Sequence, residues 1–176
     1  MGKQYKSLSK HDIDFINNQK LFYIASCSEH EVNLSPRGYD SIYVHDASTL
    51  YMIDYLGSGN RTARDISLDA QITLLFNAFE DKPKILRCFC KGECHVKGSK
   101  EFKTLSAFFN ADMRAIRQIF TFNIYAVESS CGMGVPLMQY KEDRQEVKEY
   151  ALDLSEKGLF DSYVEEHITP PDISSL

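Results

Sequence analysis

Six or seven short apolar runs make up most of the chain, and tight turns rather than helices separate most of them. The runs are residues 21–27, 32–35, 41–45, 50–55, 72–76, 85–96 and 121–127. The run from Ser41 to His45 alternates apolar and polar residues, as a strand with one buried face does. Short turns join antiparallel strands, whereas parallel strands need long crossovers. The pattern therefore predicts a mainly β fold with flanking helices, an antiparallel barrel rather than a doubly wound sheet.

Helix signals occur in a few segments. A Ser-x-x-Asp capping pattern at Ser9 predicts a short first helix. The predicted helices cover residues 10–17, 62–68, 101–120 (two helices divided near residue 111) and 141–156. Two residues are expected to interrupt strands. Pro36 should end the run that begins at Val32, and Gly92 should mark a bulge or bend within residues 85–96.

Length and charge restrict the class of protein. The 176 residues contain no linker, which indicates one domain, with the barrel at about 20–128 and a C-terminal helical segment at about 140–168. The net charge of −5 argues against nucleic acid or an anionic membrane as the main partner. No run approaches the roughly 20 apolar residues of a membrane span. The five cysteines are an odd number and no secretory signal is visible, so we expect reduced thiols and a cytoplasmic location.

The segment from Asp54 to Arg64 combines the end of an apolar run, a turn rich in small residues and two arginines. Glycines let backbone N–H groups approach an anion, and arginines supply charge at the start of a helix. The segment therefore predicts a phosphate site, although it has neither the Walker pattern nor G-x-G-x-x-G. The alternative is a strand-to-helix turn that needs glycine for its conformation and Asn60 or Thr62 as a helix cap.

Two further segments have both a functional and a structural interpretation. Arg37, in the segment from Ser35 to Gly38, could reach a phosphate held by the first loop, or could be an exposed turn residue. The segment from Cys88 to His95 holds three cysteines and a histidine, which suggests zinc. However, Cys88 and Cys90 would share the face of Leu86 on a strand, and buried cysteine behaves as a small apolar residue. We therefore expect no metal.

Taken together, these segments resemble the pyridoxamine 5′-phosphate oxidase-like family of FMN-binding split barrels. The matching pieces are Asn33–Gly38, Asp54–Thr62, Ile72–Phe76, Ile85–Arg87, Gly92–Glu93 and Ser129–Leu137. The resemblance implies a homodimer with FMN at the interface and a small-molecule substrate or reductant such as NADH or NADPH. It also implies a cofactor site made of Ser35, Arg37, Asp54, Tyr55, Ser58, Gly59, Asn60, Arg61, Thr62 and Arg87.

The chain also departs from the vitamin B6 oxidases of that family. Its phosphate loop has one cation fewer, tryptophan is absent, and the C-terminal residues do not form the basic motif that holds the substrate phosphate. Pyridoxamine phosphate oxidation is therefore not carried over, and no catalytic residue is assigned. Two hypotheses follow. The first is an FMN-dependent oxidoreductase, whose protein supplies binding and orientation. The second is a non-catalytic module for flavin, deazaflavin F420 or haem, with His95 or His167 as the haem ligand.

Overall fold

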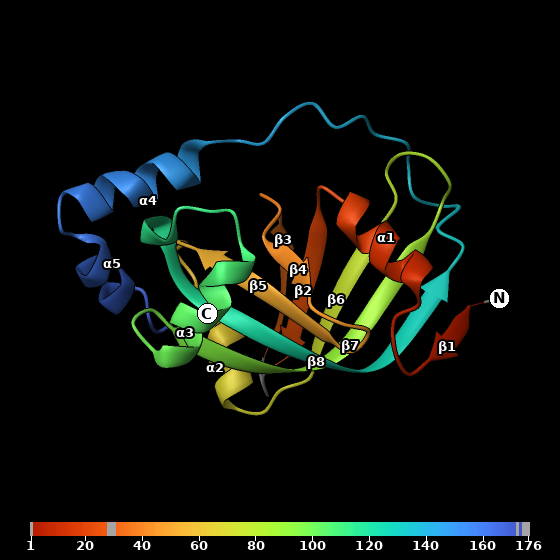
Figure 1. The fold of residues 1–176 in the computed structure, drawn as a ribbon, viewed down its shortest axis with the longest axis horizontal. Helices are drawn as coiled ribbons and strands as arrows, with labels where there is room; N and C mark the ends of the chain where they lie inside the picture. The colour runs from red at the N-terminus through yellow and green to blue at the C-terminus, as the bar shows by residue number, and fades with distance from the viewer. Residues whose placement is uncertain (1, 28–30, 172, 174–176) are drawn as a thin grey trace.

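The computed structural model describes residues 2–27, 31–171 and 173. Within them, eight strands form one sheet, and every strand pair is antiparallel (Figure 1). The strands are β1 (Lys3–Tyr5), β2 (Phe22–Cys27), β3 (Val32–Arg37), β4 (Ile42–Val44), β5 (Thr49–Tyr55), β6 (Ile72–Asn77), β7 (Ile85–Val96) and β8 (Ile116–Ser130). Their order is β3-β2-β6-β7-β8-β5-β4, and β1 pairs with β8. The predicted antiparallel architecture is confirmed.

The sheet curls into a barrel that is split on one side. Its two end strands, β3 and β4, are consecutive in the chain, and residues 38–41 join them. Such a short link requires the two edges of the sheet to approach each other. No ladder joins β3 to β4 in the described part of the chain, so the barrel stays open along this seam.

The inner face of the sheet forms the main core. The largest fully buried side chains there include Phe76, Phe120 and Phe122. Helix α1 (Lys10–Asn18) inserts Ile16 into this core, and Ile66 of helix α2 (Arg61–Ser67) packs against it. Both helices thus cover barrel residues that would otherwise contact water.

The predicted capping box of α1 is confirmed, and it does more than cap the helix. Asp12 accepts hydrogen bonds from the backbone N–H and the hydroxyl of Ser9. The same carboxylate accepts from the Tyr5 hydroxyl at 2.9 Å and from Lys84 Nζ at 2.8 Å. Asp12 therefore ties β1 and the chain segment before β7 to α1.

The prediction that Pro36 ends its strand is wrong. β3 continues to Arg37, with Pro36 opposite Tyr23 of β2. β3 is an edge strand, so the missing N–H of proline costs no ladder hydrogen bond on the open side.

Gly92 also has a different role from the predicted bulge. The register shift lies between Phe89 and Cys90, whereas Gly92 pairs regularly with Phe122. A Cβ atom at Gly92 would lie 2.8 Å from Ile66 of α2. Glycine is needed here because the helix packs directly on the strand.

Residues 101–120 were predicted to form two helices, but only a short part of this segment is α-helical. It contains helix α3 (Lys100–Leu105), the short 3₁₀ turns η1 (Ser106–Phe108) and η2 (Met113–Ala115), and the first residues of β8. Ile116, Ile119 and Phe120 have helix-like spacing, but all three are buried in strand pairing with β5. Tertiary pairing overrides the local pattern here.

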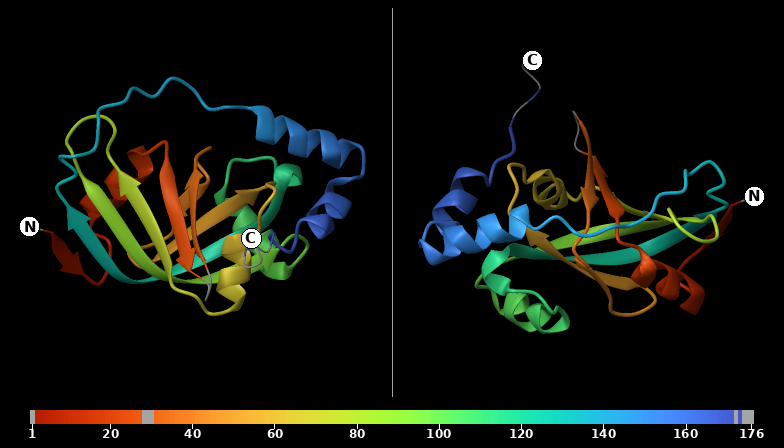
Figure 2. Two further views of the ribbon diagram at one scale, coloured as in Figure 1. Left: turned by 180° about the vertical axis from the view of Figure 1, so that it is seen from behind. Right: turned by 90° about the horizontal axis from the view of Figure 1, so that it is seen from above.

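The C-terminal part packs against one end of the barrel. Residues 131–145 run from β8 to helix α4 (Glu146–Glu156), which is shorter than predicted, and helix α5 (Phe160–Glu166) follows (Figures 1 and 2). Ala151, Leu154 and Phe160 bury their side chains with Leu56, directly after β5. None of the helices in the described ranges has the length and hydropathy of a membrane-spanning segment.

Candidate functional site

A row of polar side chains lines the inner face of β3. Asn33, Ser35 and Arg37 alternate with outward-facing Val32 and Leu34 along the strand. The Ser35 hydroxyl donates to Asn33 Oδ1 at 3.2 Å, and Asn33 Nδ2 donates to Thr62 Oγ1 at 3.2 Å. The polar row therefore faces the beginning of α2.

Asp54, at the end of β5, links this row to the rest of the site. Its side chain is 1% exposed, and its Oδ2 accepts from Arg117 Nε at 2.7 Å and Gln118 Nε2 at 2.8 Å. Its Oδ1 lies 3.6 Å from Arg37 Nη1, which is an ion pair but too long for a hydrogen bond. Asp54 Oδ1 and Arg37 Nε are buried and have no hydrogen-bond partner among the described residues. The Arg37 guanidinium thus keeps unused donor capacity.

The β5–α2 loop (residues 56–60) is held from inside the barrel. Arg117, almost fully buried, donates from Nη2 to the Gly59 carbonyl at 2.9 Å and from Nη1 to the Gly57 carbonyl at 3.4 Å. Gln118 donates to Asn60 Oδ1 at 2.9 Å. Sequence reasoning missed both residues. The available signal was a polar pair inside an otherwise apolar run from Ile116 to Phe122.

The C-terminal segment 168–171 contacts the same loop from outside. Asn60 Nδ2 donates to the Ile168 carbonyl at 3.1 Å, and Arg61 Nη2 donates to the Pro171 carbonyl at 3.1 Å. Both Asn60 and Arg61 were predicted to bind phosphate. Their donors are therefore partly occupied by the chain's own carbonyl groups.

Glu31 balances the charge of the arginines in α2. Its Oε1 lies 2.9 Å from Arg61 Nε and 2.6 Å from Arg64 Nη1. The Arg64 guanidinium, together with Arg61, holds the pKa of Glu31 below its usual range. Arg64 also contacts buried Asp65 at 2.7 Å, so Arg37 and Arg61 are the better placed cations for an added anion.

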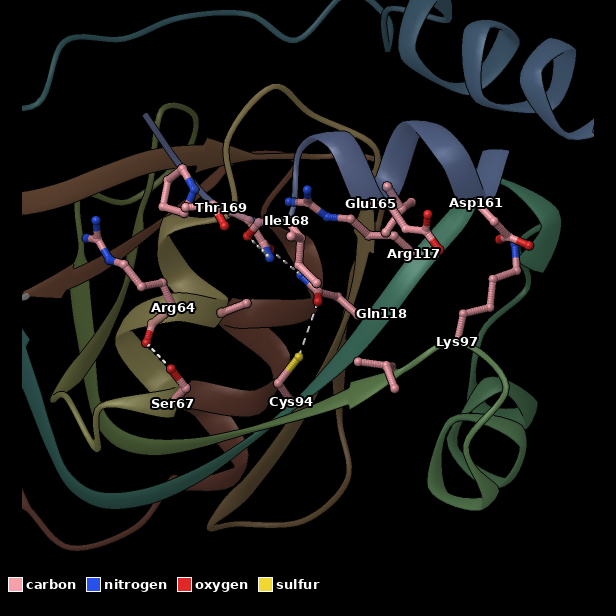
Figure 3. A pocket seen from close by; sticks show the side chains of 15 residues that line it. Arg64, Ser67, Cys94, Lys97, Arg117, Gln118, Asp161, Glu165, Ile168 and Thr169 are labelled. Atoms are coloured by element: carbon pink, nitrogen blue, oxygen red, sulfur yellow. Dashed lines mark hydrogen bonds between the residues drawn. The ribbon is translucent and has the colours of Figure 1, made fainter. Parts of the chain in front are cut away.

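A pocket of about 800 Å³ lies between helix α2, helix α5 and the C-terminal residues 168–170 (Figure 3). Arg64 and Ser67 come from α2, and Asp161 and Glu165 come from α5, with Cys94 and Gln118 between them. The Cys94 thiol donates to Gln118 Oε1 at 3.2 Å. Burial raises the pKa of this thiol to about 12, so it stays protonated at neutral pH and is a poor nucleophile.

The chain is similar to known proteins in sequence and in fold. No protein-family profile matches the chain. Its sequence is 28% identical over 144 residues to the pyridoxamine 5′-phosphate oxidase family protein ustO of Aspergillus flavus. The match covers 79% of this chain and 58% of the relative, so the chain spans little more than half of that protein. The chain is a distant relative of the pyridoxamine 5′-phosphate oxidase-like proteins.

Solved structures show the same fold. The structure of a candidate pyridoxamine 5′-phosphate oxidase from Lactobacillus delbrueckii is similar to this chain, with a TM-score of 0.55 and 18% sequence identity. The match covers 70% of this chain and 98% of the other. HupZ of Group A Streptococcus is similar with a TM-score of 0.56 and 16% sequence identity, over 68% of this chain and 91% of the other. The FAD-binding protein of Mycobacterium smegmatis has a TM-score of 0.50 and 9% sequence identity, over 70% of this chain and 96% of the other. At these identities the likeness shows the split-barrel fold alone.

From the family resemblance, Arg87 was expected to belong to the cofactor site. In this chain, β2 and β6 separate its strand, β7, from β3. By register, Arg87 shares an outward-facing row with Leu75, Tyr23 and Pro36, whereas Arg37 points to the inner face. Arg87 instead pairs with Glu128 at 3.3 Å. Within one chain, the structure does not bring Arg87 to the other predicted site residues.

Two other predicted residues have different surroundings. The Tyr55 ring packs edge-on against Tyr39, with centroids 5.2 Å apart, and burial raises the pKa of its hydroxyl. Ser58 is exposed, and its side chain makes no hydrogen bond within the described part of the chain, so it can meet a ligand. Tyr55 thus faces the α4 side, and Ser58 remains with Gly59 on the loop.

The cysteines and histidines that suggested metal or haem have other partners. Cys88 and Cys90 share the buried inner face with Leu86, as their spacing predicted. In the described ranges, no three His, Cys, Asp or Glu side chains gather in a way that could hold a metal ion. His95 Nε2 lies 2.9 Å from Thr121 Oγ1, and His167 stacks on Tyr163. Neither histidine lines the pocket of Figure 3.

Proposed function

We propose that this protein binds FMN, with the flavin phosphate held between β3 and the β5–α2 loop, and acts as a flavin-dependent oxidoreductase on a small molecule. The observation that carries the proposal is a set of contacts between three separate segments: Ser35 is linked through Asn33 to Thr62, and Arg37 faces Asp54. Arginine and hydroxyl donors of this kind are suited to a phosphate monoester.

The donor set fits the phosphate group on one structural ground. Arg37 Nε is buried without a hydrogen-bond partner, and its nearest carboxylate contact is 3.6 Å long. Buried polar groups are normally satisfied, so an arginine with spare donors beside a Ser, Asn and Thr cluster suits an anionic ligand. The bound flavin would supply the redox chemistry. Arg37, Arg61 and Thr62 would hold and orient it, and no side chain is assigned a proton-transfer role.

We also propose that two copies associate through the outer face of β3, β2, β6 and β7. Leu34, Ala25, Thr73 and Phe89 form a row across these strands by register. Val32 is 74% and Leu34 is 65% exposed, and within the described residues no helix lies over this face in the view from behind (Figure 2). A contiguous exposed apolar patch is typical of an interaction surface. A dimer through this face would also place Arg87 of each chain at the interface.

The visible spectrum of the purified protein tests the cofactor. FMN gives two flavin bands, whereas deazaflavin gives one and haem gives a Soret band. Mass spectrometry of the released ligand then identifies its phosphate ester and separates FMN from FAD. Bleaching of the flavin bands by NADH or NADPH would support catalysis, and its absence with both donors would favour the binding-module hypothesis.

The phosphate contacts are tested by Arg37→Ala and Arg61→Ala. Each should weaken FMN binding about 10- to 100-fold, because a charge-assisted hydrogen bond contributes roughly 1.5–3 kcal/mol. Arg114→Ala is the control, since Arg114 is exposed and pairs with Asp112 and Glu156, neither of which belongs to the proposed site. Unchanged FMN affinity of both site variants in calorimetric titration would contradict the proposed function.

A further inference from the structure

We propose that Arg117 is a specificity-determining positioning residue: it orients the β5–α2 loop so that the site selects a phosphorylated flavin over the same flavin without phosphate. The inference rests on the proposed function, because it concerns how the phosphate is recognised. Arg117 is 7% exposed, and its guanidinium bonds to carbonyls of the loop. Its role is therefore to hold the groups that contact the ligand.

The guanidinium fixes two loop carbonyls. Arg117 Nη2 and Nη1 donate to the carbonyls of Gly59 and Gly57, so both oxygens point toward the barrel interior. In a trans peptide the C=O and the following N–H point in opposite directions. The N–H groups of Ser58 and Asn60 therefore point away from Arg117, toward the outside of the loop.

These two amide groups are free in the described part of the chain. Neither Ser58 N nor Asn60 N donates a hydrogen bond to another described residue. Neighbouring backbone N–H groups turned to the same side can form an anion site. The loop is open on this side: a Cβ at Gly57 would meet no atom within 4 Å, and one at Gly59 would lie 3.6 Å from Arg61 Nη1.

Asp54 and Gln118 fix Arg117 in turn. Arg117 Nε donates to Asp54 Oδ2 at 2.7 Å, and the two side chains are 6% and 1% exposed. Gln118 bridges the same carboxylate to Asn60 Oδ1. One guanidinium thus contacts a carboxylate and two carbonyls at once, which needs the planar fork of arginine. Lysine keeps the charge but cannot span the three acceptors.

The test compares FMN with riboflavin, which lacks only the phosphate. Flavin fluorescence titrations at constant ionic strength give both dissociation constants for the wild type, Arg117→Lys and the control Arg114→Lys. The wild type should bind FMN about 100-fold more tightly than riboflavin or better. Arg117→Lys should reduce this ratio about 10-fold or more, while riboflavin affinity changes less than about twofold. Arg114→Lys should leave both constants unchanged.

The outcomes separate the inference from the proposed function. A wild type that binds neither flavin overturns both. A wild type that binds FMN tightly, with an unchanged FMN-to-riboflavin ratio in Arg117→Lys, overturns the role of Arg117 alone. An equal loss of both affinities shows a merely structural role and also overturns it. If Arg117→Lys does not fold, Gln118→Met replaces it, and the same ratio should fall by a smaller factor.

Discussion

Two buried carboxylates each connect segments that are distant in the sequence. Asp54 holds Arg117 of β8 and faces Arg37 of β3, and Asp12 holds Tyr5 of β1 and Lys84 before β7. A buried carboxylate that accepts several hydrogen bonds is stabilising while it is ionised and paired. The two residues differ in location, since Asp54 supports the candidate site and Asp12 supports the fold.

Asp12→Asn should lower the free energy of unfolding at pH 7 by about 2–3 kcal/mol, because it leaves Lys84 and Tyr5 without their charged acceptor. Burial alone would raise the pKa of Asp12, but hydrogen bonds from Lys84 and Ser9 outweigh it and hold the pKa below its usual value. A lowered pKa stabilises the fold above the unfolded-state pKa of about 3.9, and this stability is lost as pH falls through the folded pKa.

Urea denaturation of both proteins between pH 7 and pH 2 checks this prediction. The difference between wild type and Asp12→Asn should shrink below about pH 4. Asp14→Asn, an exposed change in the same helix, should have little effect at any pH. A constant difference down to pH 2 would contradict the assigned ionisation.

At the scale of elements, the C-terminal segment 168–171 is the part of the fold most directly linked to cofactor binding. Its carbonyls at Ile168 and Pro171 accept from the Asn60 and Arg61 side chains that the proposed phosphate site uses. Pro170 is buried between them. A carbonyl oxygen and a phosphate oxygen compete for the same donors, so docking of this segment and binding of FMN oppose each other.

A chain ending at His167 should therefore bind FMN about 3- to 10-fold more tightly than the full chain, since one or two neutral hydrogen bonds no longer need to be broken. A chain ending at Pro171 keeps both contacts and should bind like the full chain. Calorimetric titration of the three chains with FMN measures the effect. Equal or weaker binding by the chain that ends at His167 would show that the segment does not compete.

Local patterns predicted the elements whose partners lie nearby and missed those that depend on distant ones. Residues 85–96 form the predicted strand at the predicted bounds, because alternation and β-branched or aromatic residues agree there. Residues 116–120 were misread as helix, since their spacing suits both states and only pairing with β5 decides. β1 was not predicted, because its three residues form a strand only against β8.

The candidate site shows the same division. Ser35, Arg37, Asn60, Arg61 and Thr62 were predicted from turn chemistry and a family resemblance. Contacts link Ser35 to Thr62 through Asn33, and Arg37 to Asn60 through Asp54 and Gln118. Arg117 and Gln118 were missed, because their importance comes from the Gly57 and Gly59 carbonyls, roughly 60 residues away in the chain. A buried aspartate in the run 50–55 predicts a cationic partner but does not say which arginine fills the role.

At the scale of the whole molecule, the proposed dimer makes a prediction about mass. The wild type should have the mass of two chains in light scattering after size exclusion, and Leu34→Lys should shift it toward one chain. A charge placed in the centre of an apolar interface weakens the association of the two chains several-fold or more. Leu68→Lys is a matched control, because Leu68 is 64% exposed and lies in the segment after α2, away from the proposed face.

Two results would contradict the proposed interface. One is a wild type that is monomeric at the concentrations used for flavin titration. The other is a dimer that dissociates equally with Leu34→Lys and Leu68→Lys, which would indicate a general charge effect.

β8 is the last strand of the sheet to leave the ribosome, yet β7, β5 and β1 all pair with it. Lys3 finds its partner Ser129 only after the whole stretch between them has been made. Pairing between such distant residues slows folding, and strand edges that are still unpaired before β8 forms are prone to aggregate. A nascent chain that stalls before residue 116 lacks the strand that joins the two sides of the barrel, so it presents open edges for a chaperone to cover.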